Sequence, residues 1–440
     1  MSMELLNAMN GRLCSCGKVH SFAAKIITGS GAVQKIPEFV EAFGAKKVFV
    51  LSDQNTFAAA GERVCGILAD SAIPHVSHSF PEDALEPNEK SVGSAIMHYD
   101  VSCDLIIGVG SGVINDIGKI LSAVSGKPYI IVGTAPSMDG YASATSSMTR
   151  DGLKISLPSR GADVIIGDTD ILCQAPLVMM KAGLGDMLAK YVSICEWRIA
   201  KIVAGEYYCE EIAGLIRSAV QRCVDNAQGL LRREEAAVQA VFEGLVIGGV
   251  AMNYAGLSRP ASGVEHYISH VLDMRGAEFG TPVELHGIQC AVGTRIAVQL
   301  YEKLKNITPD REKALSYVRV FDYEKWSDRL RQLLGKGAES MIALETKEKK
   351  YDPALHEKRL DVILRNWDEI LRIMEAELPA LSKLEALLDT MEMPKTLQEI
   401  GTPDEMLDVV FRATKDIRDK YVLSRLCWDL GILDELLKYN

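Results

Sequence analysis

Residues 103–119 read CDLIIGVGSGVINDIGK, and this stretch decides the fold of the chain. Its first part is an apolar run typical of a buried strand, and Gly108, Gly110 and Gly112 lie where that strand turns into a helix. Glycines allow close backbone approach, and the first amides of a helix are unpaired donors that suit a pyrophosphate. The spacing departs from G-x-G-x-x-G, because Val113 replaces the third glycine, and an ordinary tight turn would explain the same residues.

The same alternation extends outward from about residue 22 to 170. Further β-branched runs are separated by longer amphipathic stretches, and they lie at 46–53, 75–80, 128–134 and 162–169. Repeated strand and helix predict a parallel sheet with helices on both faces. Ligands gather at the carboxyl ends of such strands, which here are the loops after Leu51, Val109 and Val132.

Beyond Pro176 the sequence changes to long patterns rich in Ala, Leu, Glu, Lys and Arg, which are typical of a helical domain. A chain of 440 residues is long enough for two cores. We therefore expect a dinucleotide-binding α/β domain at 1–175 and a helical domain at 176–440, with the boundary near residues 170–180.

Composition excludes several classes of protein. With 48% hydrophobic and 24% charged residues the chain is predicted to be globular, and its net charge of −11 argues against a nucleic-acid partner. The start lacks the pattern of a secretory signal. The apolar stretch 237–257 contains Gln239, Glu243 and Asn253, which favours a buried helix over a membrane span. We expect a cytoplasmic protein with no membrane partner and with ten reduced cysteines. The one close pair, Cys14 and Cys16, has no second pair at zinc-ribbon spacing, and a metal or redox role for it is the alternative.

Three of the eight histidines fall within one short window of the helical region. His266 and His270 are four residues apart, so a helix would present both imidazoles on one face. His286 follows 20 residues after His266, past a Gly- and Pro-containing turn, where a return helix can bring it opposite. The pattern is not H-E-x-x-H, because Tyr267 follows the first histidine and Glu265 lies outside the pair, pointing elsewhere.

Asp186 is a fourth candidate ligand, since a carboxylate inside an apolar helix is costly without a partner. A salt bridge to Lys190, four residues on, would also explain it. On spacing alone, a metal site and satisfied core or capping side chains remain equal alternatives.

Two polar segments lie at other predicted strand ends. Asp53 could accept hydrogen bonds from ribose hydroxyls, and a helix-capping role is the alternative. Its charge favours NAD over NADP, although the neighbouring Gln54 and Asn55 weaken that preference. The loop GTAPSMDGYAS, at 133–143, suits a nicotinamide or a substrate hydroxyl, but turn chemistry alone would explain its composition.

Four motifs together resemble the glycerol-1-phosphate dehydrogenases. They are GVGSGVINDIGK at 108–119, GLGDMLAKY at 183–191, RPASGVEHYISH at 259–270 and ELHGIQCAVG at 284–293. This family belongs to the superfamily of iron-containing alcohol dehydrogenases, glycerol dehydrogenase and dehydroquinate synthase, and the resemblance covers roughly residues 20–305. It implies an N-terminal Rossmann-like parallel-sheet domain followed by an all-helical metal-binding domain.

The resemblance also implies a role for each motif residue. Asp186, His266 and His286 would bind one divalent metal, Ni²⁺ or Zn²⁺. His270 would be a substrate or proton-relay residue, and Asp139 would contact the substrate. NAD(H), and NADP(H) as an alternative, would be held by Asp53, Gly112, Val113, Ile114, Asn115, Asp116, Thr134, Ala135, Pro136, Ser137 and Ser143.

The implied reaction is the reversible reduction of dihydroxyacetone phosphate to glycerol 1-phosphate, a small phosphorylated polyol, by hydride transfer at the metal site. Lys154, Arg160 and Arg259 are candidates for the substrate phosphate. The alternatives are a glycerol or other polyol dehydrogenase, a dehydroquinate-synthase-like cyclase and a non-catalytic nucleotide-binding protein. A homodimer is the expected assembly.

Overall fold

The computed structural model describes residues 2–82, 84–150 and 153–437. The chain forms two compact units. The first unit comprises Met1–Met187 and Gly214–Gly256, and the second comprises Leu188–Ala213 and Leu257–Asn440. This division differs from the predicted boundary near residues 170–180, because two helical segments of the later sequence, at 176–187 and 214–256, pack with the sheet-containing unit.

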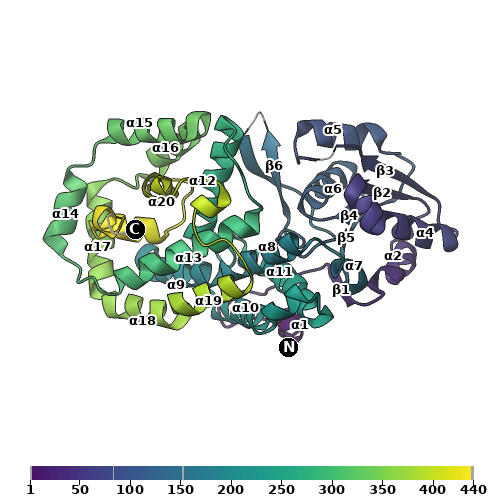
Figure 1. The fold of residues 1–440 in the computed structure, drawn as a ribbon, viewed down its shortest axis with the longest axis horizontal. Helices are drawn as coiled ribbons and strands as arrows, with labels where there is room; N and C mark the ends of the chain where they lie inside the picture. The colour runs from purple at the N-terminus through teal and green to yellow at the C-terminus, as the bar shows by residue number, and fades with distance from the viewer. Residues whose placement is uncertain (1, 83, 151–152, 438–440) are drawn as a thin grey trace. The chain divides into compact units, whose positions relative to one another are not determined.

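A six-stranded parallel sheet lies at the centre of the first unit (Figure 1). Its strands run in the order β1-β8-β5-β4-β2-β3. Their bounds are β1 Lys25–Gly29, β2 Val48–Asp53, β3 His75–Phe80, β4 Leu105–Gly110, β5 Tyr129–Gly133 and β8 Val164–Asp168. The five strands predicted from β-branched runs are confirmed. Strand β1 and the separate hairpin of β6 (Thr145–Arg150) and β7 (Leu153–Pro158) are additional, because β1 is only partly buried and β6 is polar.

Alternating strand residues cover the two faces of this sheet. On one face, β-branched and leucine side chains pack against α2 (Ile36–Ala42) and α4 (Glu62–Asp70) in a continuous core. The other face meets α6 (Gly112–Ser125), where the Tyr129 ring fills the space beside Gly108 and Gly118. Figure 1 shows α6 on the opposite side of the strands from α2 and α4. The predicted two-sided cover of a parallel sheet is therefore confirmed.

Among the described residues, one helix of the first unit is long and apolar enough, by length and composition alone, to cross a membrane. Helix α11 (Glu235–Ala255) has a mean hydropathy of 1.4 over its most apolar window, and 78% of that window is buried. Phe242 on this helix packs closely against Gly133 and Gly167 at the ends of β5 and β8. The remaining helices that lie wholly or mainly in this unit are α1 Ser2–Met9, α3 Gln54–Thr56, α5 Glu89–His98, α7 Thr169–Leu172, α8 Leu177–Leu188 and α10 Glu210–Leu231.

The described part of the second unit contains helices and no strand, as its Ala-, Leu-, Glu-, Lys- and Arg-rich sequence predicts. Its two helices in most extensive contact are α12 (Val264–Phe279) and α13 (His286–Leu304), which follow each other in the chain. The others are α9 Lys190–Ala204, α14 Arg311–Arg319, α15 Tyr323–Leu334, α16 Ala338–Glu348, α17 Pro353–Arg365, α18 Trp367–Glu377, α19 Leu381–Thr390, α20 Leu407–Thr414, α21 Leu423–Asp429 and α22 Leu433–Leu437.

Candidate nucleotide and metal site

The glycine turn leads directly into α6. Helix α6 begins at Gly112, and its N-cap residue Ser111 makes no side-chain cap hydrogen bond, so the first amides face outward from an uncapped end. A Cβ at Gly108 would overlap the Tyr129 hydroxyl, and one at Gly110 would overlap Ile114. Two of the three glycines are thus required by packing, whereas Gly112 lies at the helix end where an anion would bind.

The loop 134–143 is fastened to this turn by hydrogen bonds. Thr134 donates its N–H to the Gly110 carbonyl at 3.1 Å, and the hydroxyls of Ser137 and Ser111 lie 2.6 Å apart. Asn115 donates its side-chain N–H to the Gly140 carbonyl at 3.0 Å. Several predicted cofactor residues from two separate loops are therefore brought together at the carboxyl ends of β4 and β5, where parallel sheets bind ligands.

A buried lysine supports the far side of the same loop. The Lys119 ammonium, fully buried, pairs with Asp116 at 2.8 Å and donates to the Thr145 carbonyl at 2.6 Å. The Ser143 hydroxyl lies 2.9 Å from that of Thr145. These contacts give Asp116 and Ser143, both predicted cofactor residues, a structural role in holding the loop.

Asp53 caps a helix. Its side chain accepts the Thr56 N–H at 2.8 Å while the Thr56 hydroxyl accepts the Asp53 N–H at 3.0 Å, which is a capping box. Asp53 therefore has the helix-capping role that the sequence offered as an alternative. A ribose contact through the remaining carboxylate oxygen stays a prediction.

Asp186 lies in α8 and holds the loop 134–143 in place. Its Oδ2 accepts the Asp139 N–H at 2.9 Å, and the Asp186 side chain is buried. Helix α8 approaches the loop so closely that a Cβ at Gly183 would overlap the Pro136 carbonyl. Helix α8 ends at Leu188 and α9 begins at Lys190, with Ala189 between them still in helical conformation. A salt bridge between Asp186 and Lys190 stays an alternative explanation of the buried carboxylate.

In the second unit, the three histidine rings cluster. The ring centroids of His266 and His286 lie 5.1 Å apart, and those of His270 and His286 lie 6.2 Å apart. His266 and His270 come from successive turns of α12, and His286 is the first residue of α13. The return helix predicted from the turn before His286 therefore brings the three imidazoles together.

Hydrogen bonds fix the tautomer of His286. The Ser269 hydroxyl donates its one hydrogen to Gln289 Oε1 at 2.6 Å, so toward His286 Nδ1, 3.0 Å away, it can only accept. The Gln289 amide is oriented by its own donation to the Glu284 carbonyl at 3.1 Å. His286 therefore carries its proton on Nδ1 and presents an Nε2 lone pair, the form that a metal ligand requires.

His266 is oriented in a similar way. Its Nδ1 lies 2.8 Å from Oε1 of Glu265, so this ring also directs Nε2 away from its carboxylate partner. The expectation that Glu265 points elsewhere is wrong, because the Gly263 N–H, 2.7 Å from the same oxygen, draws this carboxylate back toward the helix start. Nearby, burial and the Glu265 carboxylate raise the pKa of Glu196 to about 8.

Cys290 is a neighbour that sequence reasoning missed. Its Sγ lies 3.6 Å from His286 Nε2, and the donor atoms of His266, His286 and Cys290 all lie within 4.8 Å of one another. Burial raises the pKa of the Cys290 thiol, but His266 and His286 outweigh that effect and the pKa is lowered. The spacing of four residues from His286 on one helix face was the available signal. Imidazole and thiolate donors suit a borderline divalent ion such as Zn²⁺ or Ni²⁺.

Two of the three candidate phosphate residues pair with carboxylates of the chain. Arg259 is buried and paired through two nitrogens with the Glu206 carboxylate, while Arg160 pairs with Asp163 at 2.9 Å. The side chain of Lys154 lies outside the described residues. The structure thus gives Arg160 and Arg259 a structural explanation that does not involve a substrate.

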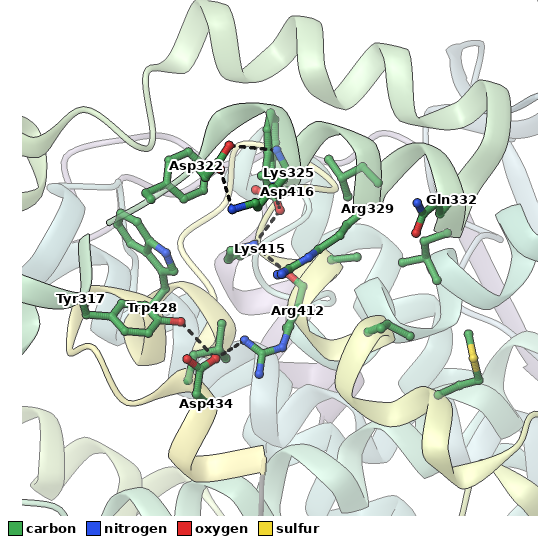
Figure 2. Close-up of a pocket in the computed structure, with 18 of the residues that line it drawn as sticks. Tyr317, Asp322, Lys325, Arg329, Gln332, Arg412, Lys415, Asp416, Trp428 and Asp434 are labelled. Atoms are coloured by element: carbon green, nitrogen blue, oxygen red, sulfur yellow. Dashed lines mark hydrogen bonds and ion pairs between the residues drawn. The ribbon is translucent and has the colours of Figure 1, made fainter. Parts of the chain in front are cut away.

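A cavity of about 610 Å³ opens among the C-terminal helices of the second unit (Figure 2). Figure 2 shows two ion pairs in its lining, Lys415 with Asp416 at 2.7 Å and Arg412 with Asp434. None of the predicted site residues whose side chains the structure describes lines this cavity. The cavity therefore shares no residue with the histidine cluster, and its lining contains five basic and three acidic side chains.

Comparison with known proteins identifies the family. The family model for iron-containing alcohol dehydrogenases matches residues 27–176. The glycerol-1-phosphate dehydrogenase (NAD(P)+) of Bacillus licheniformis is 32% identical over 320 residues, covering 72% of this chain and 80% of the relative. The chain belongs to the glycerol-1-phosphate dehydrogenase family. A family member of the same name from Methanothrix thermoacetophila is 34% identical over 284 residues, covering 63% of this chain and 77% of its own.

Solved structures share the fold. Glycerol dehydrogenase from Schizosaccharomyces pombe matches with a TM-score of 0.61 at 18% identity, covering 95% of this chain and 91% of its own. Maleylacetate reductase from Rhizobium sp. strain MTP-10005 matches with a TM-score of 0.62 at 14% identity, covering 94% and 96%. At such identities the likeness concerns the fold alone. The membership of the glycerol-1-phosphate dehydrogenase family, predicted from four motifs, is confirmed by the relatives in sequence.

Proposed function

We propose that this chain is an NAD(P)-dependent glycerol-1-phosphate dehydrogenase that reversibly reduces dihydroxyacetone phosphate to glycerol 1-phosphate. The observation that carries the proposal is the pair of imidazoles of His266 and His286, each with Nδ1 bound to a fixed polar partner. This arrangement is typical of metal-binding histidines, whose orientation is set by such outer contacts. The names of the family relatives supply the substrate.

Asp186, His266 and His286 would hold one divalent metal, with Ni²⁺ and Zn²⁺ as the proposed ions. When bound, such an ion supplies a Lewis acid that polarises a carbonyl oxygen and stabilises developing negative charge. One carboxylate and two imidazoles leave positions open for substrate, as catalytic sites require. The contact of Asp186 with the Asp139 N–H would couple the ligand to the loop that meets the substrate.

The remaining residues would bind the cofactor and move the proton. The N-terminal amides of α6, from Gly112 onward, would receive the pyrophosphate, and the loop from Thr134 to Ser137 would position the nicotinamide. Asp53 would accept the ribose hydroxyls and thereby favour NAD(H), with NADP(H) as the alternative cofactor. His270, one turn beyond His266, would donate the proton that completes alcohol formation.

The direct test is an assay of dihydroxyacetone phosphate with NADH or NADPH and a series of divalent ions, following nicotinamide absorbance. Turnover should require metal and should disappear on chelation. His266→Ala and Asp186→Asn should each lower kcat/KM by a factor on the order of 10³ or more, whereas the exposed His98→Ala should match the parent enzyme. Retained turnover in a metal-free preparation would refute the mechanism.

A glycerol dehydrogenase is the second candidate, and the partners of Arg160 and Arg259 favour testing it. Both guanidinium groups pair with carboxylates, which gives them a structural role without a substrate phosphate. Comparing glycerol with glycerol 1-phosphate as substrates separates the two activities. Preference for glycerol by a factor of ten or more would overturn the phosphorylated substrate while leaving the metal proposal standing.

We also propose that the active form is a cytoplasmic homodimer that acts without a nucleic-acid or membrane partner. Homodimers with two-fold symmetry are the commonest soluble assemblies. Light scattering coupled to size-exclusion chromatography tests the assembly, since a dimer has twice the mass of the 48.1 kDa chain.

A further inference from the structure

The segment after α1 forms a small knuckle in the first unit. Leu13 and Val19 pair as an antiparallel bridge, and the Cys14 N–H donates to the Lys18 carbonyl at 2.8 Å. The Gly17 N–H donates back to the Cys14 carbonyl at 2.9 Å, and Gly17 has φ +83°, a conformation that favours glycine. The tight turn holds the sequence C-S-C-G in a fixed loop.

Three soft donor atoms meet inside this knuckle. The ligand atoms of Cys14, Cys16 and His20 all lie within 4.8 Å of one another, and Cys16 Sγ is 3.3 Å from His20 Nε2. Cys14 is 5% exposed and His20 is 2% exposed. Around a tetrahedral zinc ion with Zn–S near 2.3 Å and Zn–N near 2.0 Å, sulfur and nitrogen ligands lie about 3.5 Å apart, so the spacing fits a shared ion.

The tautomer of His20 also fits. His20 Nδ1 lies 3.1 Å from the carbonyl oxygen of Tyr254, and the two rings stack with centroids 5.4 Å apart. A carbonyl can only accept, so Nδ1 carries the proton and Nε2 presents its lone pair toward Cys16. This is the orientation that an outer carbonyl gives to a zinc-binding histidine.

We propose that Cys14, Cys16 and His20 bind one structural Zn²⁺ ion, distinct from the metal of the proposed reaction. Two thiolates and one imidazole are a donor set that selects zinc. Structural zinc sites are closed by a fourth ligand, and replacing the other cysteines one at a time identifies it. Because His20 also bonds to Tyr254 near the end of α11, the ion would clamp residues 2–20 onto the core of the first unit.

The test compares metal content in the full-length enzyme. Cys14→Ser with Cys16→Ser should lose one zinc equivalent per chain relative to the parent, measured by elemental analysis after dialysis. Cys65→Ser, a half-buried cysteine outside the knuckle, is the matched control and should keep it. The His266→Ala variant should also keep this equivalent, which separates failure of this proposal from failure of the proposed function.

Cobalt substitution gives a direct signature of thiolate ligation. The Co²⁺ protein should show a sulfur-to-cobalt charge-transfer band that persists in Cys290→Ser and is lost in Cys16→Ser. If the Cys14 variants do not fold, the parent protein is tested with a thiol reagent before and after chelation. Removal of the ion should make two further thiols, those of Cys14 and Cys16, available to the reagent. Unchanged zinc content in the double variant, unchanged thiol reactivity on chelation, or a Cys14 to Cys16 disulfide in the isolated protein would overturn the proposal.

Discussion

The hydroxyl oxygen of Ser269 on α12 lies 3.0 Å from Nδ1 of His286 on α13. Because Ser269 passes its own hydrogen to Gln289, this single contact decides which nitrogen of His286 can bind a metal. The orientation is thus set by a helix other than the one that carries the histidine.

Ser269→Ala should therefore weaken metal binding without removing a ligand. We expect the affinity for the catalytic metal to fall about 10–100-fold, the range measured for outer-contact mutations, with activity restored by excess metal. Metal titration monitored by turnover checks this. Ser327→Ala, which also removes a buried hydroxyl of the second unit, should leave the metal affinity unchanged.

Gly183→Ala should disturb the loop 134–143. The added Cβ would overlap the Pro136 carbonyl, so helix α8 or the loop must move, at a cost of about 1–3 kcal/mol in the free energy of unfolding. Gly214→Ala is the control, because that position in α10 has open space and alanine is favoured in helices by up to about 1 kcal/mol. Urea unfolding and KM for the cofactor measure both effects. Equal stability of the two variants would contradict the close approach of α8 to the loop.

Two substitutions at Asp53 separate its capping role from its proposed cofactor role. Asp53→Asn keeps a good N-cap for Thr56 and should preserve stability, but it should raise the use of NADPH relative to NADH by removing a charge near the ribose. Asp53→Ala should in addition lose about 1 kcal/mol of stability. Kinetics with both cofactors and thermal unfolding distinguish the outcomes. An unchanged cofactor ratio in both variants would leave Asp53 as a cap alone.

Lys420 should make stability depend on pH. Burial, and then the nearby Arg259, lower its pKa from 10.5 to about 7, while its ammonium donates to the Ser262 carbonyl at 2.8 Å. Between pH 7 and 10.5 the unfolded chain binds more protons at this residue than the folded chain, so its contribution to stability rises with pH, by at most about 1.4 kcal/mol per unit.

Lys420→Met should flatten this rise, whereas the exposed Lys336→Met should keep the slope of the parent. Unfolding by urea at a series of pH values from 7 to 10 measures the slope. If the free energy of unfolding depends on pH equally in the parent and in Lys420→Met, the pKa of Lys420 is not lowered in the folded protein.

Local sequence pattern determined the five strands of the parallel sheet, the helix after the glycine turn and the helical spacing of His266 and His270. These features follow from contacts between residues near in the chain, so periodicity and turn chemistry are enough to predict them. The family motifs added the roles of the candidate ligands. The same local signals could not distinguish the capping role of Asp53 from a cofactor role, because both use one carboxylate at a strand end.

Only the tertiary structure decided which residues far apart in sequence support the site. Strand β1 pairs with β8 across more than a hundred residues, and α11 packs with the first unit although its sequence resembles the rest of the helical region. The Ser269 contact to His286 and the contact of His20 with the Tyr254 carbonyl also depend on packing. Such contacts minimise the free energy of the whole chain, and no local period encodes them.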